Sequence, residues 1–185
     1  MISRRMVGYR ASVGMRNYLI EGVSGTGKTS VCKELRRRGL HAINGDTDLA
    51  YEGDPETGEP TEDVPSHWNH IWHLDEVRAL AADQNERFTF FCGGSRNFAK
   101  FQDLFDGVFI LEIDRDTLDR RLGQRPQGEF GAQHSERDLI VRLHRTKEDT
   151  PKNGILIDAT APLAHVVDEI LRQAKAIDSA NADPA

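Results

Sequence analysis

Cysteine is scarce in this chain, and its uninterrupted apolar runs are short. Only Cys32 and Cys92 occur among 185 residues, too few for a disulfide scaffold, which favours a reducing, cytoplasmic compartment. No apolar run approaches the ~20 residues that a membrane-spanning helix needs, so no membrane contact is expected. A hydrophobic content of 38% is still enough for a full core. We therefore expect one globular domain.

Positive charge is also scarce once the N-terminus is passed. Residues 1–16 hold four arginines and no acid, which leaves 20 basic against 30 acidic residues in the remainder. Nucleic-acid binding relies on basic surface, so no nucleic-acid partner is expected. The arginine-rich start has the composition of a transit peptide, but it lacks clear amphipathic periodicity. We interpret residues 1–15 as a disordered extension.

Short apolar runs alternate with longer polar segments from Asn17 onward, a pattern typical of a parallel α/β sheet. Strands are expected at 18–20, 41–43, 88–91, 108–111 and 155–157. Helices are expected at 28–38, 68–82, 95–102, 117–122, 135–149 and 163–176. The acidic, Gly- and Pro-rich segment 46–66 predicts an irregular insertion, and 178–185 a disordered tail. The single domain then covers 16–177, with its ligands at the carboxyl ends of the strands.

The strongest motif lies between the first predicted strand and the first predicted helix. Gly22-Val23-Ser24-Gly25-Thr26-Gly27-Lys28-Thr29 fits G-x-x-x-x-G-K-[ST] at every fixed position. In such a loop, glycines let backbone N–H groups surround a β-phosphate, the lysine reaches the β- and γ-phosphates, and the threonine hydroxyl ligates Mg²⁺. We expect the following nucleotide-binding residues in this segment: Gly22, Ser24, Gly25, Thr26, Gly27, Lys28, Thr29 and Ser30.

The strand that is expected to end in a Mg²⁺-binding carboxylate lacks one. The third predicted strand ends in Cys92-Gly93-Gly94 with no acid, and Cys92 itself is interpreted as a small strand-end residue. Asp46 and Asp48, just past the second predicted strand, are the replacement that we predict. One would hold a metal-bound water and the other would orient or deprotonate an acceptor hydroxyl. The alternative is a pair of aspartates that form a turn.

These features together resemble the small P-loop kinases of the shikimate, gluconate and nucleoside/nucleotide kinase group. The resemblance runs from about Asn17 to Ala176, and the motifs that carry it are Gly22–Thr29, Asp46-x-Asp48, Gly93-Gly94, Arg121-x-x-x-Arg125 and 157–163. The stretch 91–97 is also similar to poorly characterised bacterial ATPases or nucleoside kinases. The sequence has no guanine-specific N-K-x-D motif, which argues against a GTPase. Its length also argues against a large ATPase, which would carry added modules.

The resemblance implies a three-layer α/β/α fold with strand order 2-3-1-4-5, an acceptor region at about 46–83 and an arginine lid at about 123–134. It implies that Asp46 joins Thr29 at Mg²⁺, that Asp48 contacts the acceptor, and that the loop with Ala161 and Pro162 borders the adenine of ATP. Arg121 and Arg125 would clamp the transferring phosphoryl group, with Arg121 also touching the nucleotide; the alternative is that both are solvated.

The acceptor region is unusual in its charge. Between Gly39 and Val77 there is no lysine or arginine, but there are ten acids, a set that includes Asp63. An anionic acceptor would meet like charge there, so a neutral or cationic hydroxyl compound, nucleoside- or polyol-like, is expected. Arg78 and Arg96 are the cations that could instead serve an anionic acceptor.

A run of three histidines and two tryptophans lies in the same region. Trp68 and Trp72 are four residues apart, so on a helix they would share a face and could stack on a ring, or else pack on the core. His67, His70 and His73 lack the cysteine or carboxylate that would complete a zinc pattern. We expect the acceptor to be bound by Asp48, Trp72, Gly93, Gly94 and Arg96.

The sequence therefore predicts a Mg²⁺- and ATP-dependent small-molecule kinase, present as a monomer or homodimer, with Lys28, Asp48, Arg121 and Arg125 as its catalytic residues. The rival interpretation is a nucleotide-binding switch that hydrolyses ATP to act on a protein partner.

Overall fold

The computed structural model describes residues 15–62 and 66–182. The predictions made for residues 1–14 and 183–185 fall outside that description, and so does Asp63. No helix within the described residues is both long enough and apolar enough to cross a bilayer.

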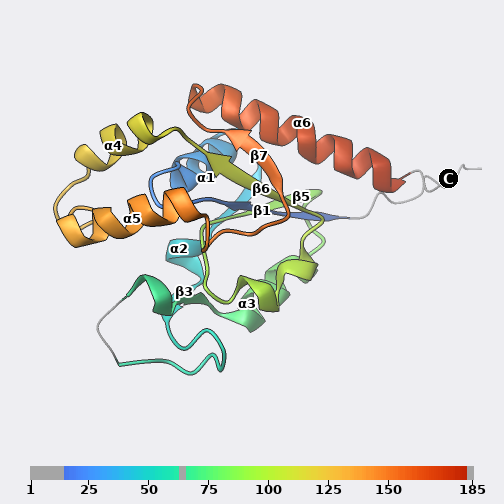
Figure 1. Cartoon of the computed structure of the whole chain (residues 1–185). Coiled ribbons are helices and arrows are strands. Elements are labelled where there is room, and N and C mark those ends of the chain that lie inside the picture. The colour runs from blue at the N-terminus through green and yellow to red at the C-terminus, as the bar shows by residue number, and fades with distance from the viewer. Residues whose placement is uncertain (1–14, 63–65, 183–185) are drawn as a thin grey trace, which may run out of the picture.

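A five-stranded parallel sheet forms the centre of the molecule (Figure 1). Its spatial order is β2-β5-β1-β6-β7. Counted within this sheet alone, that order is the expected 2-3-1-4-5. The five strands are β1 (Arg16–Glu21), β2 (His41–Asn44), β5 (Phe88–Cys92), β6 (Gly107–Glu112) and β7 (Ile155–Asp158).

Alternation of side chains along the central strands divides the apolar residues between two cores. Tyr18 and Ile20 of β1 enter the larger core, whereas Leu19 between them enters the smaller one. In β5, Phe90 and Phe91 divide in the same way. Helices are therefore needed on both faces of the sheet, because each face is apolar.

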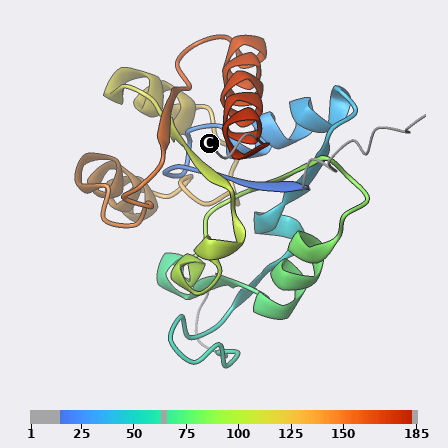
Figure 2. The ribbon, with the colours of Figure 1, turned by 90° about the vertical axis from the view of Figure 1, so that its right-hand side faces the viewer.

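Within the described residues, six α-helices and three short 3₁₀ turns surround the sheet, and the end view shows helices on both faces (Figure 2). Residues of α1, α4, α5 and α6 contribute to the larger core, and residues of α3 and the segment around η2 and η3 to the smaller one. The bounds are α1 (Lys28–Arg37), α2 (Gly45–Asp48), α3 (Leu74–Ala82), α4 (Arg115–Gly123), α5 (His134–Thr146), α6 (Leu163–Ala182), η1 (His67–Asn69), η2 (Phe98–Lys100) and η3 (Gln102–Leu104).

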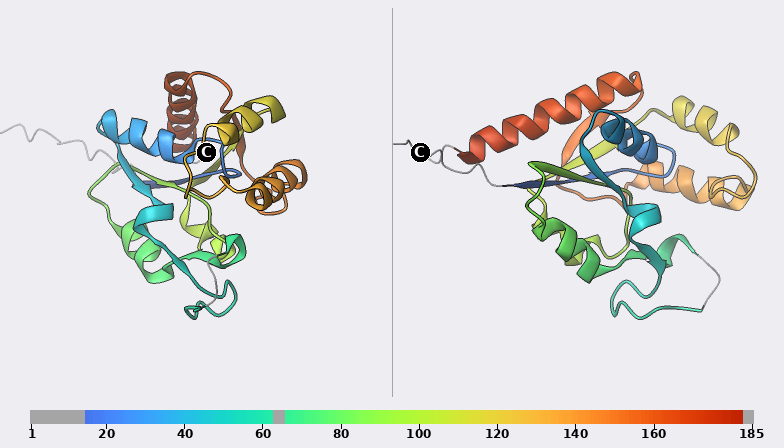
Figure 3. Two further views of the ribbon diagram at one scale, coloured as in Figure 1. Left: turned by 90° about the vertical axis from the view of Figure 1, so that its left-hand side faces the viewer. Right: turned by 180° about the vertical axis from the view of Figure 1, so that it is seen from behind.

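The prediction of one helix over 68–82 is wrong for its first half. Residues 67–69 form η1, residues 70–72 form strand β4 (His70–Trp72), and α3 begins only at Leu74. β4 pairs antiparallel with β3 (Ala50–Glu52), so the acidic insertion and the segment that follows it, up to residue 72, form a small second sheet. Figure 3 shows this insertion and α6 on opposite sides of the central sheet. The helix expected at 95–102 is likewise reduced to the two turns η2 and η3.

The last helix is longer than the sequence predicts. α6 continues to Ala182, so the expectation that the chain is disordered from Asp178 is wrong for residues 178–182. Asp178 is buried and accepts hydrogen bonds from Arg16 at 3.2 Å and Arg87 at 2.7 Å. A buried carboxylate requires such partners, and these two bonds link the end of α6 to the start of β1 and to the residue before β5.

Candidate active site

The loop between β1 and α1 has the backbone shape that its glycines predict. Gly25 and Gly27 have φ angles of +98° and +107°, which favour glycine. The Thr26 hydroxyl donates to the carbonyl oxygen of Val23 at 2.9 Å, and this bond closes the turn. The Lys28 ammonium donates to the carbonyl oxygen of Gly22 at 2.5 Å and so lies back over the loop. This geometry presents backbone N–H groups and one cation to the same space.

A cleft of about 510 Å³ opens over that loop. Its walls come from the loop, from α1, from α4 and from the segment that follows β7. The cleft is lined by Ser24, Gly25, Thr26, Gly27, Lys28, Thr29, Ser30, Arg121 and Ala161 among the expected nucleotide-binding residues. Two others differ: Gly22 lines the neighbouring cavity, and Pro162 lines neither cavity but accepts hydrogen bonds from the first turns of α6.

The two expected lid arginines both line this cleft, in different ways. Arg121 donates to the carbonyl oxygens of Gly25, Thr26 and Ala159 at 3.1, 2.8 and 2.8 Å, so it joins the loop to the segment after β7. Arg125 donates to the Ser24 hydroxyl at 3.0 Å and to the carbonyl oxygen of Phe130. Burial lowers the pKa of both guanidinium groups.

Asp46 is the member of the predicted aspartate pair that lines this cleft. Its Oδ1 atom accepts a hydrogen bond from the backbone N–H of Gly94 at 3.0 Å and lies 3.3 Å from Nε2 of His70. Burial acts to raise the pKa of Asp46. The hydrogen bond with His70 and the charge of Lys28 outweigh that effect and hold the pKa below its ordinary value. Asp46 is therefore an ionised group in a fixed position.

The resemblance implies Asp46 at Mg²⁺ and Asp48 at the acceptor, but of the two only Asp46 lines a cavity in the structure. Asp48 lines neither cavity; its carboxylate pairs with Arg36 of α1 at 2.9 Å and accepts from the Asn44 backbone N–H at 3.1 Å. A spacing of two residues within the single turn of α2 directs the two side chains to different surroundings. Asp48 is therefore corrected to a residue that closes the turn, which was the alternative interpretation.

A second cavity, of about 700 Å³, adjoins the nucleotide cleft, and Ser24, Lys28 and Asp46 line both. Its other walls come from the acidic insertion, the turn after β5, the loop before α5, and α5 itself. Of the residues expected to bind the acceptor, Gly94 and Arg96 line this cavity. Gly93 does not line it, but a Cβ atom added there would come within 2.6 Å of Oδ1 of Asp46.

Trp72 is corrected from acceptor-binding residue to core residue. It is 1% exposed and stacks on Phe101, with ring centroids 5.6 Å apart. Because β4 replaces the first turns of the expected helix, Trp68 and Trp72 do not share a helical face. Trp68 is the tryptophan that lines the second cavity.

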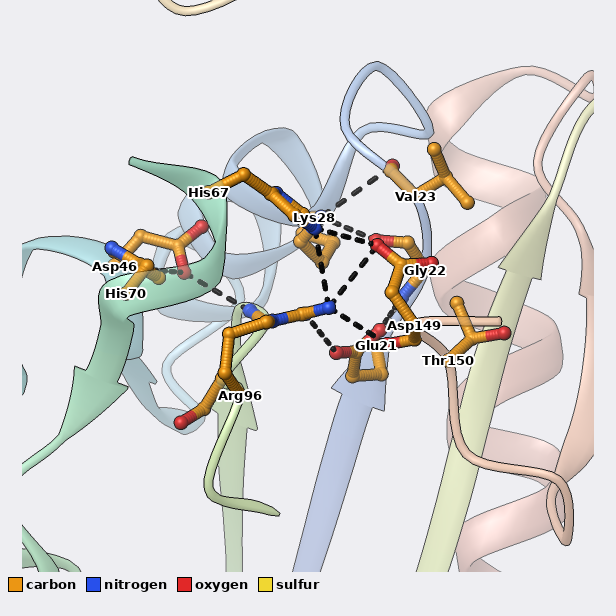
Figure 4. Close-up of polar contacts among 12 residues, drawn as sticks. Glu21, Gly22, Val23, Lys28, Asp46, His67, His70, Arg96, Asp149 and Thr150 are labelled. Atoms are coloured by element: carbon orange, nitrogen blue, oxygen red, sulfur yellow. Dashed lines mark hydrogen bonds and ion pairs between the residues drawn. The ribbon is translucent and has the colours of Figure 1, made fainter. Parts of the chain in front are cut away.

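The floor of the second cavity is a buried charged cluster that sequence reasoning missed, shown in Figure 4. Arg96 lies 3.2 Å from a carboxylate oxygen of Asp149 and 3.7 Å from Oε1 of Glu21. His67 lies 3.1 Å from the same oxygen of Asp149. Three atoms of the cluster are buried without a hydrogen-bond partner among the described residues: Glu21 Oε1, Arg96 Nε and Asp149 Oδ1.

Glu21 and Asp149 titrate differently within this cluster. Burial raises the pKa of Glu21 to about 7, against the opposing influence of Lys28 and Arg96. For Asp149, the bond from His67 and the charge of Arg96 outweigh burial and lower the pKa. The signal for Glu21 was present in the sequence, as an acid at the last position of an apolar strand; Asp149 lies more than fifty residues from Arg96 and gave none.

The cleft also has the chemistry that Mg²⁺ prefers. The Thr29 hydroxyl and the Asp46 carboxylate supply oxygen ligands on the walls of one cleft beside Lys28, and the Oδ2 atom of Asp46 accepts no hydrogen bond from any residue that the structure describes. Asp46 and Thr29 therefore fit the ion. No group of three or more histidine, cysteine or acidic side chains that could hold a metal by themselves occurs in the described ranges.

Comparison with known proteins identifies the fold. A family model described as an AAA domain matches residues 19–142. Similar solved structures include a sugar kinase from Janibacter sp. HTCC2649 (18% identity, TM-score 0.51, covering 85% of this chain and 93% of that one). Others are a gluconokinase from Sinorhizobium meliloti 1021 (19%, 0.50, 94% and 95%) and a shikimate kinase from Bacteroides thetaiotaomicron (16%, 0.52, 87% and 99%). No curated protein sequence matches this chain. At these identities the likeness concerns the fold, which is that of the P-loop kinases.

Proposed function

The chain belongs to the AAA-domain family, with the fold of the P-loop kinase group, and from that premise we propose that it is a Mg²⁺- and ATP-dependent kinase for a small neutral or cationic acceptor with a free hydroxyl. The observation that carries this proposal is the position of Asp46. It lines both the nucleotide cleft and the second cavity, together with Lys28 and Ser24. A carboxylate between a phosphate-binding loop and an adjoining cavity is suited to a hydroxyl that attacks a bound nucleotide.

In the proposed reaction, ATP occupies the cleft over residues 22–29 and the acceptor occupies the second cavity. The acceptor oxygen forms a bond to the γ-phosphorus while the bond from that phosphorus to the β–γ bridging oxygen breaks, which releases ADP. The hydroxyl proton passes to the Asp46 carboxylate. Lys28, Arg121 and Arg125 offset the negative charge of the phosphates. Thr29 would hold Mg²⁺ and Asp46 would hold a water bound to that ion, and the ion would neutralise the charge further.

The charges of the second cavity support a neutral or cationic acceptor. Beyond Asp46, the acids that line it are Glu52, Glu136 and Asp149. Two cations also line it: Lys28, which the phosphates of ATP would engage, and Arg96, which is only 10% exposed and pairs with Asp149 and Glu21. Asp46, Glu52 and Glu136 are then the acids that remain without a balancing cation in this cavity. Arg78, the other cation considered for an anionic acceptor, pairs with Asp75 and lines neither cavity. An anionic acceptor would therefore meet an excess of negative charge.

The test is acceptor-stimulated release of ADP from Mg²⁺-ATP, across nucleosides, polyols, sugars, shikimate and nucleoside monophosphates. Asp46→Asn and Asp48→Asn are the matched variants, because both exchange a carboxylate for an amide within one turn. We expect one neutral or cationic compound to stimulate release, Asp46→Asn to abolish it, and Asp48→Asn to retain it. Hydrolysis that no compound stimulates would overturn the kinase proposal and favour an ATP-driven switch. Efficient turnover of shikimate or a nucleotide would overturn the charge argument.

A further inference from the structure

Exposed apolar side chains gather around the two cavities. Among the described residues, the exposed large hydrophobic side chains are Trp68, Phe130, Leu156 and Leu163. Trp68 and Phe130 line the second cavity, and Leu163 lines the nucleotide cleft. Only Leu156, on the edge strand β7, lies away from both. Exposed aromatic surface is costly in water, so two such side chains at one cavity indicate a binding surface.

The two aromatic residues are held in place by their neighbours. The His67 ring stacks on Phe130 with centroids 5.9 Å apart and an interplanar angle of 14°, and it meets Trp68 edge to face at 5.0 Å. The guanidinium of Arg142 lies over the Trp68 ring at 5.9 Å. Through His67, this aromatic wall joins Asp149 and the charged floor. Side chains packed in this way lose little further freedom when a ligand binds.

The second cavity therefore has an aromatic wall, made by Trp68, Phe130 and His67, and the carboxylate of Asp46 also lines it. We propose that the wall binds a flat, unsaturated ring of the acceptor, whose hydroxyl-bearing part extends toward Asp46. This inference rests on the proposed function and narrows it: of the nucleoside-like and polyol-like acceptors, it selects those with a flat ring. The excess of acids in the cavity requires that ring to be neutral or cationic.

A binding measurement tests whether the second cavity binds a flat ring, and it does not require turnover. Of the two tryptophans in the chain, Trp72 is buried, so Trp68 supplies the fluorescence change at the cavity. The probes are cytidine, guanosine, pyridoxine and thiamine, which carry flat rings, against methyl β-riboside, which has the sugar of cytidine but lacks its flat base. Each is titrated into the full chain with ADP and Mg²⁺ present, by tryptophan fluorescence and by calorimetry.

We expect at least one flat-ring probe to bind and quench the fluorescence, and methyl β-riboside to bind about 5- to 150-fold more weakly. Trp68→Ala should weaken the ring probe by the same factor, and Trp68→Phe should retain most of the affinity. Leu156→Ala, at a still more exposed apolar residue outside both cavities, should leave the affinity unchanged.

The outcomes separate this inference from the proposed function. If no flat-ring probe binds in either measurement, or if Trp68→Ala leaves its affinity unchanged, the inference is overturned. Suppose instead that a compound without a flat ring stimulates ADP release in a manner that depends on Asp46 but not on Trp68. In that case the kinase proposal stands and the inference of a flat ring is overturned. If ring probes bind through Trp68 but none stimulates ADP release, the ring site stands and the kinase proposal fails.

Discussion

The Oδ1 atom of Asp46 accepts a 3.0 Å hydrogen bond from the backbone N–H of Gly94, so the turn that follows β5 holds the carboxylate shared by the two cavities. That turn passes between two acids. A Cβ atom would lie 2.6 Å from Asp46 if added to Gly93, and 3.0 Å from Glu21 if added to Gly94. The two glycines replace the acid expected at this strand end because Asp46 and Glu21 approach from either side.

Gly93→Ala is expected to displace Asp46. The added methyl would meet both Oδ1 of Asp46 and the buried ring of Trp72, at 2.6 and 2.7 Å. We expect the rate of ADP release to fall at least about 10-fold, because misplacement of a reacting group by a fraction of an ångström is costly. The unfolding free energy should fall by about 1–3 kcal/mol.

Gly39→Ala is the matched control for that change. Gly39 follows α1 with a φ of +79° and has no atom within 4 Å of an added Cβ. It should lose about 1 kcal/mol of stability from backbone strain but keep the parent rate. Equal losses of rate in the two variants would contradict the role assigned to the turn.

Glu21→Gln is expected to change how stability depends on pH. Because burial raises the pKa of folded Glu21 to about 7, above its ordinary 4.5, the folded state binds a proton between these values that the unfolded state releases. Stability from this group is therefore full below about pH 4.5, falls as the pH rises, and is lost above about pH 7. The total is on the order of 3 kcal/mol.

Urea unfolding at pH 5, 6, 7 and 8 measures this effect. Relative to the parent, Glu21→Gln should flatten the decline in unfolding free energy over that range, since an amide does not titrate there. Glu76→Gln, at an exposed position on α3, should follow the parent curve. Parallel curves for Glu21→Gln and the parent would show that Glu21 ionises normally in the folded protein.

The two lid arginines should have separable effects. Arg125→Gln removes a charge that contacts the phosphate loop through Ser24, so kcat should fall at least about 10²-fold with a small change in stability. Arg121→Gln removes three hydrogen bonds to backbone carbonyls, so it should lower the unfolding free energy by about 2 kcal/mol and raise the KM for ATP.

Arg120→Gln is the control for both variants. Arg120 precedes Arg121 on α4, lines neither cavity and contacts Thr117 within the same helix. Steady-state kinetics and urea unfolding of the three variants should leave Arg120→Gln close to the parent. A kcat for Arg125→Gln as high as that of Arg120→Gln would remove Arg125 from the proposed transfer step.

Two sequence patterns near Asp46 were ambiguous for a physical reason. An Asp-x-Asp pair specifies two carboxylates but not the direction in which each points, and that direction depends on whether the backbone turns there, as it does in α2. A spacing of four placed Trp68 and Trp72 on one face only if the segment is helical. It forms a 3₁₀ turn followed by β4, because β4 pairs with β3 in a two-stranded sheet.

The sequence by itself determined where the central strands and the phosphate-binding loop lie, because the alternation of apolar runs and the spacing from Gly22 to Thr29 are local properties of the chain. The order of the strands in the sheet followed only from the family resemblance. The tertiary structure alone decided which carboxylate enters the site and which pairs with Arg36. It also brought Glu21, His67, Arg96 and Asp149 into one buried cluster, and Trp68 and Phe130 to one cavity. These residues belong to segments far apart in the chain. Their proximity arises from packing between elements, and no local pattern records it.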